Sequence, residues 1–337
     1  MEVGASPLTI RVVTDGRAGI ENQALGLAEA VARLTPAVID VRRVRWRPVF
    51  DWLPADLKTP AMLDPASDAP FPPDGEPWPD LWIAAGRASL PLSLAARNRS
   101  GGRTVVVQVQ NPRLDPMRFD LVVAPKHDGL TGTNVISITG SPHRITPERL
   151  AEAAPAFVAG IEPLPRPRVA VMIGGRSKAF DLPSGHAARL ADRIARAVQD
   201  AGGSALVTFS RRTPGEAQTI MAARLSAVPG QVWDGTGPNP LFAFLHAADH
   251  ILVTEDSANM ATEAASTGKP VHILAMVTRG SAVKFARLHA DLTARGATRP
   301  FDSPLTAWTY PPLAETQRAA RMVLDFVANR KKVVLAI

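Results

Sequence analysis

The sequence predicts an α/β protein built from two doubly wound, Rossmann-like domains, and three observations support this prediction. The chain has 337 residues, whereas a single hydrophobic core rarely grows beyond roughly 250–300 residues. Short apolar runs rich in β-branched residues alternate with amphipathic helical segments, as in parallel sheets built from βαβ units. Segment 162–168, in which three of seven residues are proline, interrupts the alternation, which then restarts. We therefore expect a stiff linker at this point.

The first half of the chain is expected to form one complete sheet. A strand over 8–14 precedes a helix whose apolar face carries Ala24, Leu27, Ala28, Val31 and Leu34. Further elements are predicted as strands at 38–44, 81–84, 104–109, 121–123 and 135–138, and as helices at 90–99 and 147–159. Segment 45–79 follows neither period and is expected to be a surface excursion of this domain, which we place at 1–161.

The second half repeats the pattern. Its clearest helix carries Leu190, Ile194, Ala197 and Val198 on one face. Strands are predicted at 169–173, 205–209, 231–233, 250–254 and 271–274. A last helix is expected near 313–329, so the second domain is placed at 168–312.

The composition excludes several classes of protein. Apolar residues make up 46% and charged residues 20% of the chain, which rules out wholesale disorder. The absence of cysteine excludes disulfides, thiolate zinc sites and a cysteine nucleophile. No apolar run approaches the roughly 18 residues of a membrane span and no signal peptide is visible, so we expect a soluble, cytoplasmic protein. The net charge of +7 suits phosphate-bearing substrates or anionic lipid, but no nucleic-acid recognition signature accompanies it.

Two cationic loops in the second half are candidates for binding an anion. In open parallel sheets, ligands gather at the carboxyl ends of strands, where helix N-termini present free N–H groups. Two glycines in one loop would let a ligand approach the backbone closely, and Thr213 with Pro214 predicts a helix start in the other. The alternative is solvated surface arginines and an ordinary turn. The residues predicted to surround a diphosphate are Gly174, Gly175, Arg176, Ser177, Lys178, Ser210, Arg211, Arg212 and Thr213.

A third loop follows the strand predicted at 250–254. Ser257 is expected to cap a helix, with Glu263 about two turns further along. Glu255 and Asp256 would repel phosphate, so we expect them to accept hydrogen bonds from sugar hydroxyls. Their alternative role is to stabilise the helix dipole.

The first half offers weaker candidates. Asp15 and Arg17 follow the first strand, where they could position an acceptor hydroxyl with Asp15 as base, or form a structural turn. His127 and Asp128 follow another strand and are further candidate bases, although a lone histidine is more often a surface residue. His246 and His250 lack an accompanying carboxylate motif, so no metal is assigned.

Segment 42–52 mixes arginines with tryptophans. This pattern fits either a membrane interface or a strand end with two half-buried tryptophans.

Several of these segments resemble the mitochondrial-fission "elongated mitochondria" family, which has plant and many bacterial members. The resemblance is carried by Gly16–Leu27, Gln108–Arg113, Ser210–Pro214, Thr254–Ser257 and Gly268–Val271, and it runs over nearly the whole chain. In plants the family helps to recruit a dynamin-related protein to mitochondria, and this sequence looks bacterial. The resemblance therefore also implies an adaptor role as one alternative.

The second half is more distantly similar to GT-B glycosyltransferases. That resemblance implies that Ser257, Met260 and Glu263 lie along a donor nucleotide sugar, with Gly174, Gly175 and Arg211 by its diphosphate. It also implies that the C-terminal helix within 313–337 returns to the first domain. The acceptor side would include Gly16, Arg17, Gly19, Asn22 and Gln23.

Together these observations predict a metal-independent glycosyltransferase that uses a nucleoside-diphosphate sugar as substrate, with no cofactor. The expected acceptor is an envelope or lipid-linked sugar at the inner membrane face, with peripheral contact to an anionic membrane. The alternatives are a sugar-nucleotide epimerase and a non-catalytic adaptor.

Overall fold

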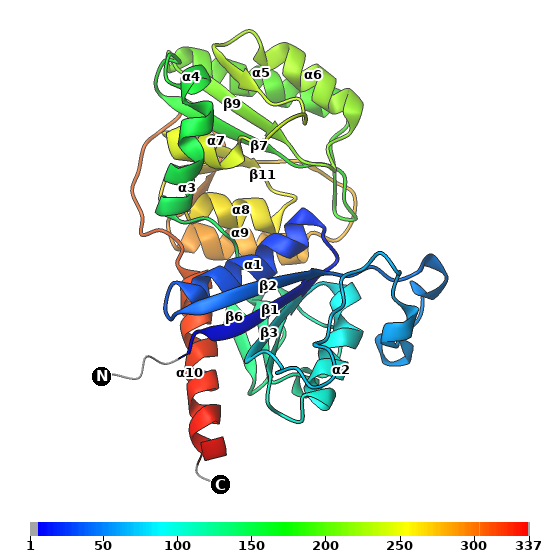
Figure 1. Cartoon of the computed structure of the whole chain (residues 1–337). Coiled ribbons are helices and arrows are strands. Elements are labelled where there is room, and N and C mark those ends of the chain that lie inside the picture. The colour runs from blue at the N-terminus through cyan, green and yellow to red at the C-terminus, as the bar shows by residue number, and fades with distance from the viewer. Residues whose placement is uncertain (1–5, 303, 336–337) are drawn as a thin grey trace, which may run out of the picture. The chain divides into compact units, whose positions relative to one another are not determined.

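The computed structural model describes residues 6–302 and 304–335, and the chain divides into two compact units. Unit 1 comprises Met1–Arg144 and Ala314–Ile337, and unit 2 comprises Ile145–Leu313 (Figure 1). Within the described ranges, no helix is long and apolar enough to cross a lipid bilayer.

Unit 1 is built on a six-stranded, fully parallel sheet in the order β2–β1–β3–β4–β5–β6. Its strands are β1 (Leu8–Thr14), β2 (Ala37–Arg43), β3 (Leu81–Ala85), β4 (Val105–Val109), β5 (Leu121–Pro125) and β6 (Val135–Ile138). Its helices are α1 (Ala18–Ala32), α2 (Leu90–Arg99) and α10 (Glu315–Leu335). Strands β3, β4 and β5 are buried along their whole length because apolar groups cover both faces of the sheet.

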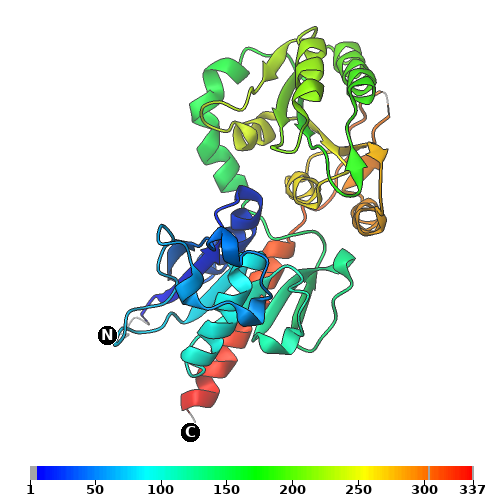
Figure 2. The same cartoon turned by 90° about the vertical axis from the view of Figure 1, so that its right-hand side faces the viewer.

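The C-terminal helix α10 belongs to unit 1, as predicted. Ala319, Ala320 and Val323 are fully buried in the same core as α1. Figure 2 shows α10 in red. At the start of α10, the carboxylate of Glu315 accepts a hydrogen bond from the Thr139 backbone N–H at 3.1 Å. The last helix of the chain therefore completes the hydrophobic core of unit 1.

Unit 2 contains a second six-stranded parallel sheet, in the order β10–β9–β7–β11–β12–β14. Its strands are β7 (Arg168–Ile173), β9 (Ser204–Phe209), β10 (Gly230–Val232), β11 (His250–Thr254), β12 (Val271–Leu274) and β14 (Thr298–Pro300), with an antiparallel pair β8 (Phe180–Asp181) and β13 (Val277–Thr278). Its helices are α3 (Pro147–Ala153), α4 (Val158–Ile161), α5 (Ser184–Asp200), α6 (Gly215–Leu225), α7 (Leu241–Ala247), α8 (Ala258–Ala265) and α9 (Val283–Ala294). The strand order reverses between β7 and β11, and this switch point is where doubly wound sheets bind ligands.

The boundary between the units differs from the linker predicted at 162–168. Residues 145–161 belong to unit 2 rather than to the first domain, because Ile145 and Leu150 pack in one cluster with Leu245 and Ala248. The predicted helix at 147–159 is divided into α3, a 3₁₀ turn η7 (Ala154–Phe157) and α4.

The excursion predicted at 45–79 is made of short turns. It includes the 3₁₀ turns η1 (Pro48–Phe50), η2 (Ala55–Leu57) and η3 (Pro60–Met62). Its two N-terminal tryptophans differ sharply. Trp46 is buried and donates to the Ala88 carbonyl at 2.9 Å, whereas Trp52 is 78% exposed.

Candidate functional site

The site in unit 2 is assembled at the switch point of its sheet. The loop after β7 begins with Gly174 and Gly175, and the loop after β11 contains Asp256. The Gly174 N–H donates to Thr254 Oγ1 at 2.7 Å, and the Gly175 N–H donates to Asp256 Oδ2 at 3.1 Å. Thr254 Oγ1 in turn donates to Asp256 Oδ1 at 2.7 Å. These bonds fix the two loops to each other.

The loop after β9 is attached to the same pair. Arg212 Nη2 lies 2.8 Å from Asp256 Oδ2, and the Arg176 N–H donates to the Arg212 carbonyl at 2.9 Å. Thr213 Oγ1 donates to the Gly174 carbonyl at 2.6 Å. The structure therefore brings together all three of the loops that the sequence singled out.

The two glycines have a different role from the predicted one. A Cβ on Gly174 would lie 1.9 Å from Asp256 Oδ1, and one on Gly175 would lie 2.0 Å from the Arg212 carbonyl oxygen. The protein's own loops occupy the space where a side chain would sit. Glycine is required here because the loops pack against each other, before any ligand is considered.

The acidic residues of the third loop also differ from expectation. The Asp256 side chain is fully buried, and its oxygens are occupied by the contacts described above. It therefore braces the loops and is not available to sugar hydroxyls. Glu255 uses Oε1 to accept the Met276 N–H at 2.6 Å, which ties this loop to the end of β12.

The hydroxyl side chains mostly support the loops. Ser257 Oγ accepts the Met260 N–H at 3.4 Å, which confirms Ser257 as the N-cap of α8. The N-cap of α6 is Pro214 rather than Thr213, because the Thr213 hydroxyl is turned towards the β7 loop. Ser177 Oγ accepts the Phe180 N–H at 3.1 Å, and Ser210 Oγ lies 3.2 Å from Thr213 Oγ1.

Four cations lie on the solvent side of this braced arrangement. Arg176, Lys178, Arg211 and Arg212 are all exposed. Only Arg212 of these reaches a buried carboxylate, and Arg176 is 3.8 Å from Asp181. Arg212 lies against Asp256, two residues before the first residue of α8, and a cation beside a capped helix N-terminus is suited to an anion.

Glu263 has the most unusual environment of the predicted donor residues. It lies on α8, and burial alone raises the pKa of its carboxyl group to about 7. Within the described chain, no hydrogen-bond or ion-pair partner contacts that carboxyl group. Met260 lies one turn earlier and is half-buried. A partly buried carboxyl group without a partner is available to accept hydrogen bonds from ligand hydroxyls.

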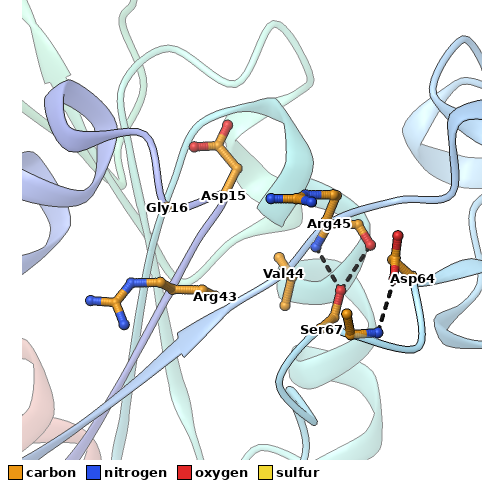
Figure 3. Close-up of a pocket in the computed structure, with 8 residues that line it drawn as sticks. Asp15, Gly16, Arg43, Val44, Arg45, Asp64 and Ser67 are labelled. Carbon is orange, nitrogen blue, oxygen red and sulfur yellow. Dashed lines mark hydrogen bonds between the residues drawn. The ribbon is translucent and has the colours of Figure 1, made fainter.

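Two of the candidate residues of unit 1, Asp15 and Gly16, line a pocket of about 340 Å³ (Figure 3). Asp15 accepts hydrogen bonds from the backbone N–H of Arg17 at 3.1 Å and from its Nε at 2.8 Å. Arg45 extends towards Asp15 in Figure 3, whereas Arg43 extends away to its paired contacts with Glu21 at 2.8 Å. The lining residues are Asp15, Gly16, Arg43, Val44, Arg45, Asp64, Ala66 and Ser67.

A pair of glutamines beside this loop was only partly anticipated. Gln23 is buried, donates to the Gly19 carbonyl at 3.1 Å, and accepts from Gln110 Nε2 at 3.1 Å. Gln110 follows β4 with φ of 74°, a left-handed conformation that is uncommon outside glycine. Such backbone strain at a strand end is typical of functional sites. The sequence pattern contained Gln110 but gave no sign of its conformation. Asn22 is half-buried and is the fifth residue of α1.

His127 and Asp128 do not join Asp15. They follow β5, and two strands, β3 and β4, separate β5 from β1 in the sheet. Three strand spacings amount to about 14 Å, which is too far for one catalytic pair. His127 is buried, with Nε2 4.0 Å from Asp128 Oδ1.

Comparison with known protein families gives a match over most of the chain. The model described as "Mitochondrial fission ELM1" matches residues 18–327. The Arabidopsis thaliana "Mitochondrial fission protein ELM1" is 30% identical over 75% of this chain, which spans 65% of the length of that relative. The "Uncharacterized protein RP120" of Rickettsia prowazekii (strain Madrid E) is 24% identical over 94% of this chain and 98% of its own length.

Comparison with solved structures identifies the fold as GT-B. The UDP-GlcNAc 2-epimerase of Neisseria meningitidis, bound to UDP-GlcNAc, matches 98% of this chain and 99% of its own with a TM-score of 0.52 and 13% identity. The Methanocaldococcus jannaschii enzyme in complex with UDP-GlcNAc and UDP matches 94% and 99% with a TM-score of 0.53 and 12% identity. Os79 from O. sativa, in complex with UDP, matches 96% and 94% with a TM-score of 0.50 and 11% identity. The predicted fold class is thereby confirmed.

Proposed function

Because the chain belongs to the mitochondrial fission ELM1 family and has the GT-B fold, we propose that it is a glycosyltransferase that uses a nucleoside-diphosphate sugar. The observation that carries the proposal is the braced loop arrangement at the switch point of unit 2. A buried carboxylate holds three loops together there, while cations remain on their solvent side. The solved structures with this fold that bind UDP or UDP-GlcNAc support a uridine nucleotide as the first donor to test.

The donor diphosphate would bind the cations of these loops. Arg211, Arg176 and Lys178 are exposed on loops whose backbone is held by hydrogen bonds, so little backbone ordering is left to complete on binding. Together with the N-terminus of α8 they would stabilise the negative charge that develops on the leaving diphosphate. Glu263 would accept hydrogen bonds from hydroxyls of the ribose or the sugar. No metal is assigned a role in this scheme.

The acceptor would bind unit 1. An acceptor hydroxyl would attack the anomeric carbon, the bond from that carbon to the diphosphate oxygen would break, and the hydroxyl proton would pass to Asp15. Arg17 now occupies the Asp15 carboxylate, but the Arg17 side chain is 63% exposed and can turn to another anion. The pocket beside Asp15 gives an acceptor a place to bind, which favours transfer over epimerisation of the donor alone.

Calorimetric titration of the full chain with UDP-GlcNAc and with GDP-, ADP- and CMP-sugars tests the donor site. We expect binding of one class, and a loss of about tenfold to a hundredfold in affinity for Arg211→Ala. Arg196→Ala is the matched control, because it removes one exposed positive charge from α5 of the same unit. A folded chain that binds none of these donors overturns the proposal and leaves the adaptor role.

Epimerisation is the second candidate, because two of the solved structures above are UDP-GlcNAc 2-epimerases. Incubation with donor and no acceptor separates the two reactions. A new sugar nucleotide in that mixture identifies an epimerase, whereas unchanged donor that is consumed only with acceptor identifies a transferase. In the second case Asp15→Asn should abolish transfer and leave donor affinity unchanged.

A further inference from the structure

Residues 46–63 form a small lobe on unit 1, closed at its base by an antiparallel bridge between Trp46 and Leu63. In Figure 1 it is the blue segment that projects from the edge of the unit 1 sheet. Its inner side is well anchored. Trp46 is 3% exposed, and Lys58 Nζ lies 5.1 Å from the centre of the Trp46 ring. The lobe is therefore a defined part of the unit 1 fold.

The outer side of the lobe is apolar. Val49, Trp52 and Leu57 are 66%, 78% and 60% exposed. A fourth apolar side chain, Met117, is 58% exposed on the neighbouring 3₁₀ turn η5 (Pro116–Arg118). An ion pair between Arg118 and Asp56 fastens that turn to the lobe. Four large apolar side chains exposed on adjoining turns indicate an interaction surface rather than scattered surface residues.

Charges of both signs surround this surface, and two of its arginines have no carboxylate partner within the part of the chain that the structure describes. Arg45 and Arg47 are exposed at the base of the lobe, and among the described residues no carboxylate lies within ion-pair distance of either. The two acids of the lobe lie beside arginines. Asp56 pairs with Arg118, and Asp51 is close enough to Arg17 to contribute to its raised pKa. An exposed tryptophan beside arginines that have no carboxylate partner is suited to the headgroup region of an anionic bilayer, where the ring lies at the interface and the arginines bind anionic headgroups.

We propose that this lobe docks unit 1 onto an anionic lipid bilayer, with Val49, Trp52 and Leu57 entering the boundary between headgroups and acyl chains. Besides Asp15 and Gly16, the pocket described above is lined by residues of the two segments that lead into and out of the lobe, namely Arg43, Val44, Arg45, Asp64, Ala66 and Ser67. An acceptor in that pocket would lie beside the base of the lobe that contacts the membrane. The acceptor class is therefore a lipid-linked one, and this last step rests on the proposed transferase function, whereas the docking does not.

Flotation of the full chain with vesicles tests the docking. We expect it to float with vesicles of phosphatidylcholine and phosphatidylglycerol, to float much less with phosphatidylcholine alone, and to detach as salt is raised. Trp52→Ser should weaken vesicle binding about tenfold or more, and Arg47→Gln by about fivefold. Val158→Ser and Arg196→Gln are the matched controls, because they remove an exposed apolar group and an exposed cation from unit 2.

Two measurements keep the result unambiguous. Lipids brominated in their acyl chains should quench part of the tryptophan fluorescence of the original chain, and this part should be missing in Trp52→Ser. Failure of the chain to float with anionic vesicles, or equal flotation of Trp52→Ser, overturns the proposal. So does sedimentation showing a dimer that Trp52→Ser dissociates, which would assign the surface to a second copy. Calorimetry with the donor on the same samples reports the transferase proposal separately, since Trp52 lies in neither proposed binding site.

Discussion

The loop after β7 in unit 2 is hydrogen-bonded to a buried carboxylate, that of Asp256. The loop after β1 in unit 1 instead contains an ion pair between two of its own residues, Asp15 and Arg17. Asp256 is fully buried and binds Arg212 and the Gly175 N–H from two neighbouring loops, and it also accepts a hydrogen bond from Thr254 of its own segment. Asp15 is 13% exposed and pairs with Arg17, two residues away in the same loop. Equivalent positions of two similar sheets thus show two arrangements. One fixes several loops rigidly, and the other leaves a carboxylate that can exchange its partner.

The largest test of this comparison is removal of the two carboxylates. Asp256→Ala removes the partner of the Arg212 guanidinium, of the buried Gly175 N–H and of the Thr254 hydroxyl, so we expect a loss of about 3–5 kcal/mol in the free energy of unfolding. Asp15→Ala should cost about 1 kcal/mol or less, because its ion pair is close to solvent. Urea unfolding followed by circular dichroism measures both, with the exposed Asp192→Ala as control. Equal losses of unfolding free energy for Asp256→Ala and Asp15→Ala would show that Asp256 does not hold the loops of unit 2 together.

Glycine substitutions sharpen the same comparison. In Gly174→Ala the new Cβ would lie 1.9 Å from Asp256 Oδ1, and we expect a loss of about 3 kcal/mol as the loops move apart. In Gly16→Ala the nearest atom is the flexible Arg43 Cδ at 3.5 Å, so the cost is that of φ at +75°, about 1 kcal/mol. Gly215→Ala, with open space around its Cβ, should be neutral or slightly stabilising. The midpoint of thermal unfolding reports the order, and a neutral Gly174→Ala would contradict it.

The smallest test uses two glutamates with opposite pKa shifts. Burial raises the pKa of Glu263 in unit 2 to about 7, whereas hydrogen bonds from Arg43 lower the pKa of Glu21 in unit 1. The folded chain holds the Glu263 proton more tightly than the unfolded chain, so Glu263 reduces stability as pH rises from about 4.5 to 7. The free energy of unfolding of Glu263→Gln should therefore exceed that of the original chain, by a difference that grows to about 1–3 kcal/mol as pH rises towards 7.

Glu21 contributes in the opposite sense. Its stabilisation is present above its unfolded pKa and is lost as pH falls through its folded pKa, so Glu21→Gln should cost up to about 1 kcal/mol at pH 7 and less in acid. Urea midpoints from pH 4 to pH 8 measure both variants, with the exposed Glu152→Gln as control. Parallel pH profiles for Glu263→Gln and the original chain would show that Glu263 ionises normally.

The sequence was sufficient to predict which loops meet. Carboxyl ends of parallel strands share one edge of a sheet, so residues after β7, β9 and β11 had to lie near one another once those strands were identified. Apolar runs rich in β-branched residues identify strands, and β1, β6, β11 and β12 begin and end where predicted. Strand β14 was missed because it is short, lies at the edge and ends in Pro300.

What the sequence could not predict is which atoms satisfy each group. Glycine permits close approach of any partner, so the pattern could not distinguish a ligand from Asp256 beside Gly174. The Thr213 hydroxyl can cap a helix or bond a carbonyl of another strand, and the choice depends on the fold around it. The pocket beside Asp15 depends on the path of residues 64–67, which follow neither a helical nor a strand period.

The position of α10 has a consequence for the order in which the protein is made. The core of unit 1 includes Ala319, Ala320 and Val323, but unit 2 is continuous from Ile145 to Leu313. A chain emerging from the ribosome has therefore delivered every residue of unit 2 before the last helix of unit 1 exists. Domains usually fold in the order of their synthesis, but here the unit that starts first can only finish last. Until α10 has been synthesised, the apolar face of α1 lacks the helix against which it packs, and this exposed face would be a binding surface for a chaperone.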